Sequence, residues 1–165
     1  TVMQELQEVI SSLRSYSRSD LSRDSRISLA ETLSSIREEM EALATARDMT
    51  LLMHDEPSWH TQMGSANVFL AGLKCLLRGY VLAGQAGDRM FLRLEKTDCD
   101  AKLVMTTSRN MLDGAHIFFP NNHIAQDLSL AALCFLQTGA LLLGLREQQI
   151  EFHTGPATQQ VIIHL

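Results

Sequence analysis

The feature that most constrains the fold is an uncharged run, LSLAALCFLQTGALLLGL, at residues 128–145. It is followed by REQQIEFHTGPATQQVIIHL, in which a Gly-Pro turn separates two strand-like segments. A run of this length raises the alternative of a transmembrane helix, but Gln137, Thr138 and Gly139 interrupt it and it lacks an aromatic belt. We therefore expect a helix buried between a sheet and other helices, followed by two strands.

Composition limits the class of protein. The chain has 165 residues, of which 45% are hydrophobic, enough for one domain with a sizeable core and a helical extension. Its net charge of −5 argues against nucleic-acid binding, which normally needs a basic patch. The three cysteines have no metal-ligand spacing, and reduced thiols fit a cytoplasmic location. Because the chain begins with Thr1, we expect it to be a piece of a longer protein.

The N-terminal segment has apolar residues at alternating spacings of four and three, which is a heptad pattern. The residues of this seam are Val2, Leu6, Val9, Leu13 and Tyr16. The pattern favours pairing with another helix, and the predicted role is a dimerisation helix. An ordinary amphipathic helix packed on its own domain is the alternative.

Periodicity predicts the remaining elements. Residues 17–28, rich in serine and charge, are expected to form a connector. Helical spacing predicts helices from residue 29 to about 43 and over residues 65–82. The predicted strands lie at residues 49–53, 90–95, 103–108 and on either side of the Gly-Pro turn. The fold class is therefore α+β: a two-layer sandwich with a mixed sheet covered by helices on one face.

This order of elements resembles the ATP-binding domain of sensor histidine kinases, which belongs to a superfamily shared with gyrase and MutL. The segment LRSYSRSDLSRDSRISLAETL is similar to the junction between the dimerisation hairpin and that domain. The resemblance implies a dimerisation helix and connector at residues 1–25 and a kinase-like domain at residues 26–165. The family's phosphoacceptor histidine would lie on a hairpin helix that this chain does not contain.

The resemblance also implies where a nucleotide would bind, and the expected residues are replaced there. On the helix NVFLAGLKCLLRGY, Gly72 and Leu76 stand at the two asparagine positions that hold Mg²⁺ and phosphate. Neither residue offers the oxygen ligand that Mg²⁺ requires. After the strand LVMTTS, Arg109 stands where an aspartate accepts the adenine amino group, and Met111 stands at the following glycine. Arginine is a donor only.

The third nucleotide-binding motif of the family is a glycine-rich loop at the start of the last helix. Here Asp127 and Ser129 stand at the glycine positions, and an aspartate at a helix N-terminus repels a triphosphate. The resemblance therefore implies a degenerate domain that needs no ATP or Mg²⁺. The enzyme alternative is a divergent but active kinase that binds Mg-ATP through other polar groups. Its candidate residues are Asn67, Asn110, Asp113, Asn121 and Asn122.

Other chemistry has weaker support in the sequence. The segment MHDEPSWH brings His54 and His60 near two carboxylates, but a polar surface loop explains it better than a metal site. Phe118 and Phe119 are a possible apolar anchor for a partner, with core packing as the equal alternative.

The function predicted from these observations is a non-catalytic signalling module of a two-component or phosphorelay system. It would form a homodimer and bind a response-regulator receiver domain or another histidine kinase, without contact to nucleic acid or membrane. A small-molecule sensor that reuses the emptied pocket is a further alternative.

Overall fold

The computed structural model describes residues 2–17, 25–54, 60–63, 66–96, 101–111, 128–145 and 147–164. Its main feature is a five-stranded mixed sheet with the strand order β2-β4-β5-β7-β6. The strands are β2 (Thr50–His54), β4 (Arg89–Lys96), β5 (Ala101–Thr107), β6 (Ile150–Thr154) and β7 (Gln159–His164). The β2–β4 pair is parallel and the other pairs are antiparallel.

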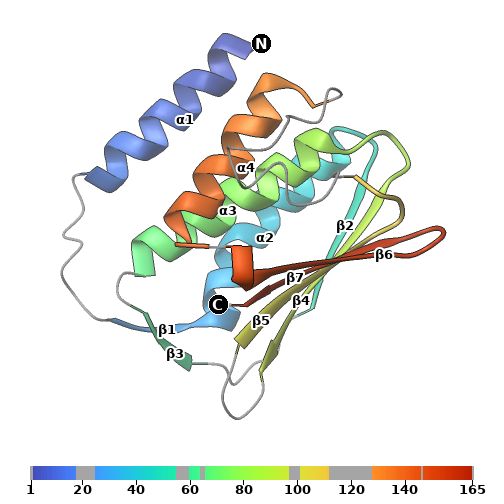
Figure 1. Ribbon diagram of the computed structural model, residues 1–165. Helices are drawn as coiled ribbons and strands as arrows, with labels where there is room; N and C mark the ends of the chain where they lie inside the picture. The colour runs from blue at the N-terminus through green and yellow to red at the C-terminus, as the bar shows by residue number, and fades with distance from the viewer. Residues whose placement is uncertain are drawn as a thin grey trace.

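Helices α2 (Leu29–Thr45), α3 (Ala66–Ala83) and α4 (Leu130–Leu142) cover one face of this sheet, and α1 (Val2–Ser17) lies outside them (Figure 1). A short 3-10 helix, η2 (Glu147–Gln149), leads into β6. The predicted two-layer α/β sandwich is confirmed, with the helices on one face of a mixed sheet.

Two short strands were not predicted. β1 (Ser25–Ser28) and β3 (His60–Met63) pair antiparallel to each other, apart from the main sheet. The prediction of an unstructured connector up to residue 28 and of a loop up to residue 60 was therefore wrong at these residues. Both strands have only four residues and are largely polar, so they carry no alternation that the sequence could reveal.

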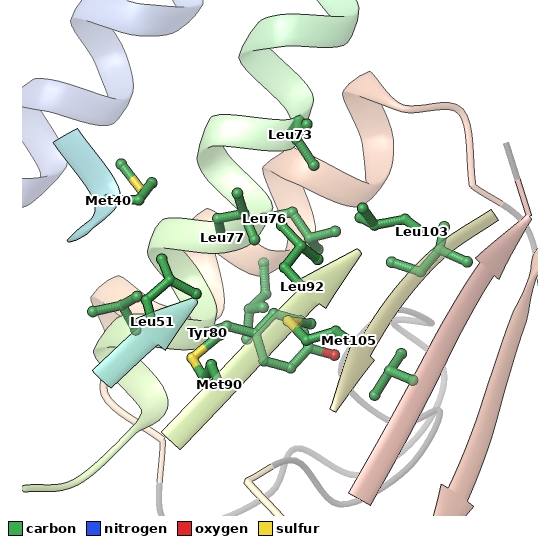
Figure 2. Close-up of a cluster of buried hydrophobic side chains, with 14 of the residues drawn as sticks. Met40, Leu51, Leu73, Leu76, Leu77, Tyr80, Met90, Leu92, Leu103 and Met105 are labelled. Carbon is green, nitrogen blue, oxygen red and sulfur yellow. The ribbon is translucent and has the colours of Figure 1, made fainter. Parts of the chain in front are cut away.

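The core lies between the helices and the sheet. In β4, Met90, Leu92 and Leu94 are buried against the helices, so Arg89 and Phe91 face the opposite side. Figure 2 shows the centre of this core, where side chains of α2 and α3 meet those of β2, β4 and β5. The buried members labelled there include Met40, Leu51, Leu73, Leu76, Leu77, Tyr80, Met90, Leu92, Leu103 and Met105.

Two glycines let α3 and α4 pack closely. A Cβ atom on Gly139 would lie 2.6 Å from the backbone nitrogen of Leu76, and one on Gly79 would lie 2.6 Å from Cγ of Leu136. Neither separation is compatible with a side chain, so the absence of a Cβ is what permits this contact. The apolar run at residues 128–145 is thus a buried helix, as predicted. Among the described residues, no helix is both long and apolar enough to cross a membrane.

Candidate functional site

The two positions expected to hold Mg²⁺ both face inward on α3. Gly72 lies against α4, where a Cβ atom would be 2.9 Å from Cγ of Leu143. Leu76 is fully buried in the main core (Figure 2). No oxygen ligand stands at either position, and the space around both is filled by the close contact of α3 with α4. Asn67 lies in the first turn of α3, and its side chain is outside the described residues.

At the end of β5, Arg109 has an internal partner. Its Nε lies 2.8 and 2.9 Å from the two carboxylate oxygens of Asp88. The Asp88 side chain is only 8% exposed, and it also accepts a 2.7 Å hydrogen bond from the backbone N–H of Gln85. The buried carboxylate is therefore compensated by a charge and by a backbone donor. The residue at the adenine-binding position is thus engaged in a structural ion pair.

Met111 is buried two residues further along the chain. A Cβ atom on Gly84, directly after α3, would collide with Cε of Met49 and lie 2.8 Å from Cε of Met111. Two methionine methyl groups therefore pack directly on the backbone at Gly84. The thioether side chain is well suited to fill such an irregular gap. At the position where the resemblance implies a glycine, this chain has a side chain that packs beside Gly84.

At the start of α4, Ser129 acts as the N-cap. Its φ and ψ of −63° and 149° are extended, and its Oγ accepts a 3.1 Å hydrogen bond from the N–H of Ala132. The free N–H groups at a helix start are the groups that bind phosphate in nucleotide sites. One of them is satisfied here by the chain itself. Asp127, like Phe118, Phe119, Asp113, Asn121 and Asn122, lies outside the described residues.

A charged junction that joins α1, α2, α3 and α4 was not predicted from the sequence. Arg78 on α3 pairs with Glu8 of α1 and lies 3.9 Å from Glu39 of α2. Its guanidinium also stacks over the ring of Phe135 on α4, 5.1 Å from the centroid. Lys74, one turn earlier on α3, donates a 3.0 Å hydrogen bond to Glu39. A possible signal was the presence of Lys74 and Arg78 four residues apart on a helix that is otherwise apolar.

This junction fixes where α1 lies. Figure 1 shows α1 alongside α3 and α4 of the same chain. Of the predicted dimer seam, Leu6 is half-buried, whereas the side chains of Val2, Val9, Leu13 and Tyr16 are outside the described residues. Met3 and Ile10, seven residues apart on α1, are exposed apolar side chains. The contact of α1 with its own domain fits the alternative of an amphipathic helix, and the dimer seam stays a prediction.

One cluster of titratable groups and one buried thiol remain. Glu151 on β6 lies 3.0 Å from Nε2 of His153 and 2.7 Å from Nε2 of His164, and these hydrogen bonds hold the pKa of its carboxyl below the usual value. Burial raises the pKa of the Cys75 thiol to about 11, so this cysteine is a poor nucleophile. Within the described ranges, no group of three or more His, Cys, Asp or Glu side chains could hold a metal ion. The loop of residues 55–59, between His54 and His60, is outside those ranges.

Tyr80, on the same helix as Gly72 and Leu76, is completely buried. Burial raises the pKa of its phenol well above the usual value. In the part of the chain that the structure describes, its hydroxyl has no hydrogen-bond partner. Among the described residues, the ring is therefore held in the core by apolar packing.

Comparison with known proteins gives matches only at the level of structure. No protein family and no curated protein matches the sequence. A histidine kinase from Burkholderia phymatum STM815 matches over 96% of this chain and 78% of its own, with 14% identity and a TM-score of 0.57. The catalytic domain of histidine kinase ThkA matches over 87% of this chain and 95% of its own, with 10% identity and a TM-score of 0.67.

A structure of ThkA in complex with the response regulator protein TrrA matches over 99% of this chain and 47% of the ThkA chain. Its identity is 11% and its TM-score 0.65. At these identities the likeness concerns the fold. The chain has the fold of a histidine kinase catalytic domain.

Proposed function

We propose that this chain, which has the fold of a histidine kinase catalytic domain, is a non-catalytic signalling module that does not bind Mg-ATP. One observation carries the proposal: in each of the three expected nucleotide-binding motifs, a described residue is used by the chain's own structure. Leu76 lies in the core, Arg109 pairs with Asp88, and Ser129 caps α4. A nucleotide would have to displace these internal contacts before it gained its own.

The module acts through protein partners, namely a response-regulator receiver domain or another histidine kinase, and as a homodimer along α1. The solved complex of ThkA with a response regulator supports that kind of partner, because the ThkA structure in that complex matches this chain over nearly all of its length. The heptad pattern and the exposed side chains of Met3 and Ile10 on α1 support self-association. Light scattering on the purified chain tests the dimer, and titration with receiver domains of the same organism tests the partner.

Thermal unfolding with and without millimolar Mg-ATP tests the loss of nucleotide binding. A ligand at about 100 times its Kd stabilises the fold by about 2.7 kcal/mol, which for a domain of this size raises the midpoint by about 5 °C or more. We expect no shift for this chain and a clear shift for an active kinase catalytic domain measured in parallel. A shift of that size in this chain would refute the proposal.

The second candidate is a divergent kinase that binds Mg-ATP. The fold itself favours it, as does the presence of two amide side chains near the expected site. Asn67 lies in the first turn of α3, and Asn110 is exposed just after β5. If Mg-ATP stabilises the chain, Asn67→Ala and Asn110→Ala should each abolish part of that shift, and Gln160→Ala, which changes an amide on the outer face of the sheet, should not.

A further inference from the structure

The outer face of the main sheet has a groove that none of the expected sites uses. Helices cover only the inner face of the sheet, so alternate side chains of each strand point away from them (Figure 1). The groove has a volume of about 260 Å³ and crosses from β2 over β4 to β5. The residues that line it include Thr50, Leu52, Phe91, Thr106, Ser108 and Thr158.

The floor of the groove is apolar. Leu52 on β2 and Phe91 on β4 are direct partners in the parallel ladder, so their side chains lie next to each other on the outer face. Leu52 is 56% exposed and Phe91 is 38% exposed. A dry cavity of roughly 150 Å³ is enough to hold a benzene molecule. This groove therefore has room for at least one large apolar side chain.

One rim of the groove carries a positive charge. Arg89 precedes Phe91 by two residues on β4, so both point to the same face, and Arg89 is the ladder partner of Thr50. Arg89 is exposed, and within the described ranges its guanidinium has neither an ion pair nor a hydrogen bond. Arg93, further along the same strand, is instead neutralised by Glu95 at 2.6 Å. Arg89 is thus available to a carboxylate from outside the chain.

We propose that this groove docks a protein partner through an apolar anchor side chain followed by an acidic residue. The anchor packs on Leu52 and Phe91, and its neighbouring carboxylate forms a bidentate ion pair with Arg89. Leu52 lies on β2, an edge strand that pairs only with β4 among the described residues. A partner segment therefore reaches the groove from that side without crossing another strand. This surface lies on the opposite face of the sheet from the helices, and its occupancy is independent of nucleotide binding.

The probe for this proposal is a phage-displayed library of random peptides selected on the intact chain. We expect the enriched peptides to share an aromatic or leucine residue beside Asp or Glu. Fluorescence polarisation of one enriched peptide then compares the wild type with Leu52→Ala and Arg89→Glu. Each change should weaken binding by about tenfold or more. Leu52→Ala removes apolar contact with the anchor side chain, and Arg89→Glu removes the ion pair with the acidic residue.

The controls separate docking from damage to the fold. Leu141→Ala removes a side chain that is 78% exposed on α4, in the other layer, and should leave peptide binding unchanged. A peptide with Lys in place of its acidic residue should bind the Arg89→Glu variant better than it binds the wild type. The proposal would be overturned if the enriched peptides lacked acidic residues. It would also be overturned if one enriched peptide bound the wild type, Leu52→Ala and Arg89→Glu equally well. A wild-type dimer that Arg89→Glu dissociates would also overturn it, because the occupant would then be a second copy.

Discussion

The contact of α3 with α4 leads to a sharp prediction about Gly139. A Cβ atom at this position would lie 2.6 Å from N and 2.8 Å from Cα of Leu76, and 2.9 Å from the carbonyl oxygen of Gly72. All three are backbone atoms of one helix, so none can move without shifting α3. The substitution Gly139→Ala must therefore push the two helices apart.

The magnitude follows from two opposing effects. Alanine is favoured over glycine in a helix interior by about 1 kcal/mol. Overpacking of a well-packed core costs about 1–3 kcal/mol, and more where backbone has to move. Since every clash here involves backbone, we expect a net loss of about 2 kcal/mol. That loss lowers the midpoint of thermal unfolding by about 4–8 °C.

Two matched variants test the reasoning by circular dichroism melting. Gly72→Ala faces only side-chain atoms of Leu142 and Leu143, which can adjust, so its loss should be smaller. Leu141→Ala, on the exposed side of α4, should change stability by less than about 0.5 kcal/mol. A Gly139→Ala protein as stable as the wild type, or more stable, would show that the helices do not approach as closely as described.

Three further changes report on other parts of the molecule. Tyr80→Phe removes a buried hydroxyl that has no partner among the described residues, so it should raise the free energy of unfolding measured in urea by about 1 kcal/mol, and a lower free energy of unfolding would contradict this. Arg78→Met removes the ion pairs to Glu8 and Glu39, so amide hydrogen exchange should become faster in α1 while α3 stays protected; unchanged exchange in α1 would show that these ion pairs do not hold α1 against the other helices. Hydrogen bonds lower the folded-state pKa of Glu151 from 4.5, so its contribution to stability is complete above that pH and is lost as the pH falls through the lowered value. The stability difference between the wild type and Glu151→Gln should therefore shrink on acidification below about pH 4.5, and a constant difference would refute this origin.

The elements that were predicted well from the sequence are long segments in which apolar residues recur at a regular spacing. The helix expected at residues 65–82 is α3 at Ala66–Ala83, and the strands expected at residues 90–95 and 103–108 overlap β4 and β5. These segments contribute half of the buried hydrophobic residues, so burial shapes their pattern. β1 and β3 were missed because each is stabilised by pairing with the other, across α2 and β2 in the sequence. The residue preferences of either segment alone do not reveal the strand with which it pairs.

The candidate site could be located from the sequence only in part. The element order placed Gly72, Leu76, Arg109 and Ser129 at the positions where related domains bind nucleotide, but it did not show what these residues do instead. The partner of Arg109 is Asp88, in the turn before β4, and that pairing follows from the antiparallel register of β4 with β5. Contacts of this kind become visible only when the chain is folded.

The residues on which the proposed loss of nucleotide binding rests also stabilise the fold of this chain. Leu76 adds an apolar side chain to the core where an asparagine amide would need hydrogen-bond partners, and burial of an unpaired amide is costly. Gly139 lets α4 approach the backbone of Leu76, which removes space beside that position. The Arg109–Asp88 pair joins the end of β5 to the start of β4. Under the proposed function, nucleotide binding would require several changes, each of which would weaken the present packing before the next one supplied a ligand contact. The proposed module would then keep the catalytic-domain fold as a stable scaffold for protein contacts.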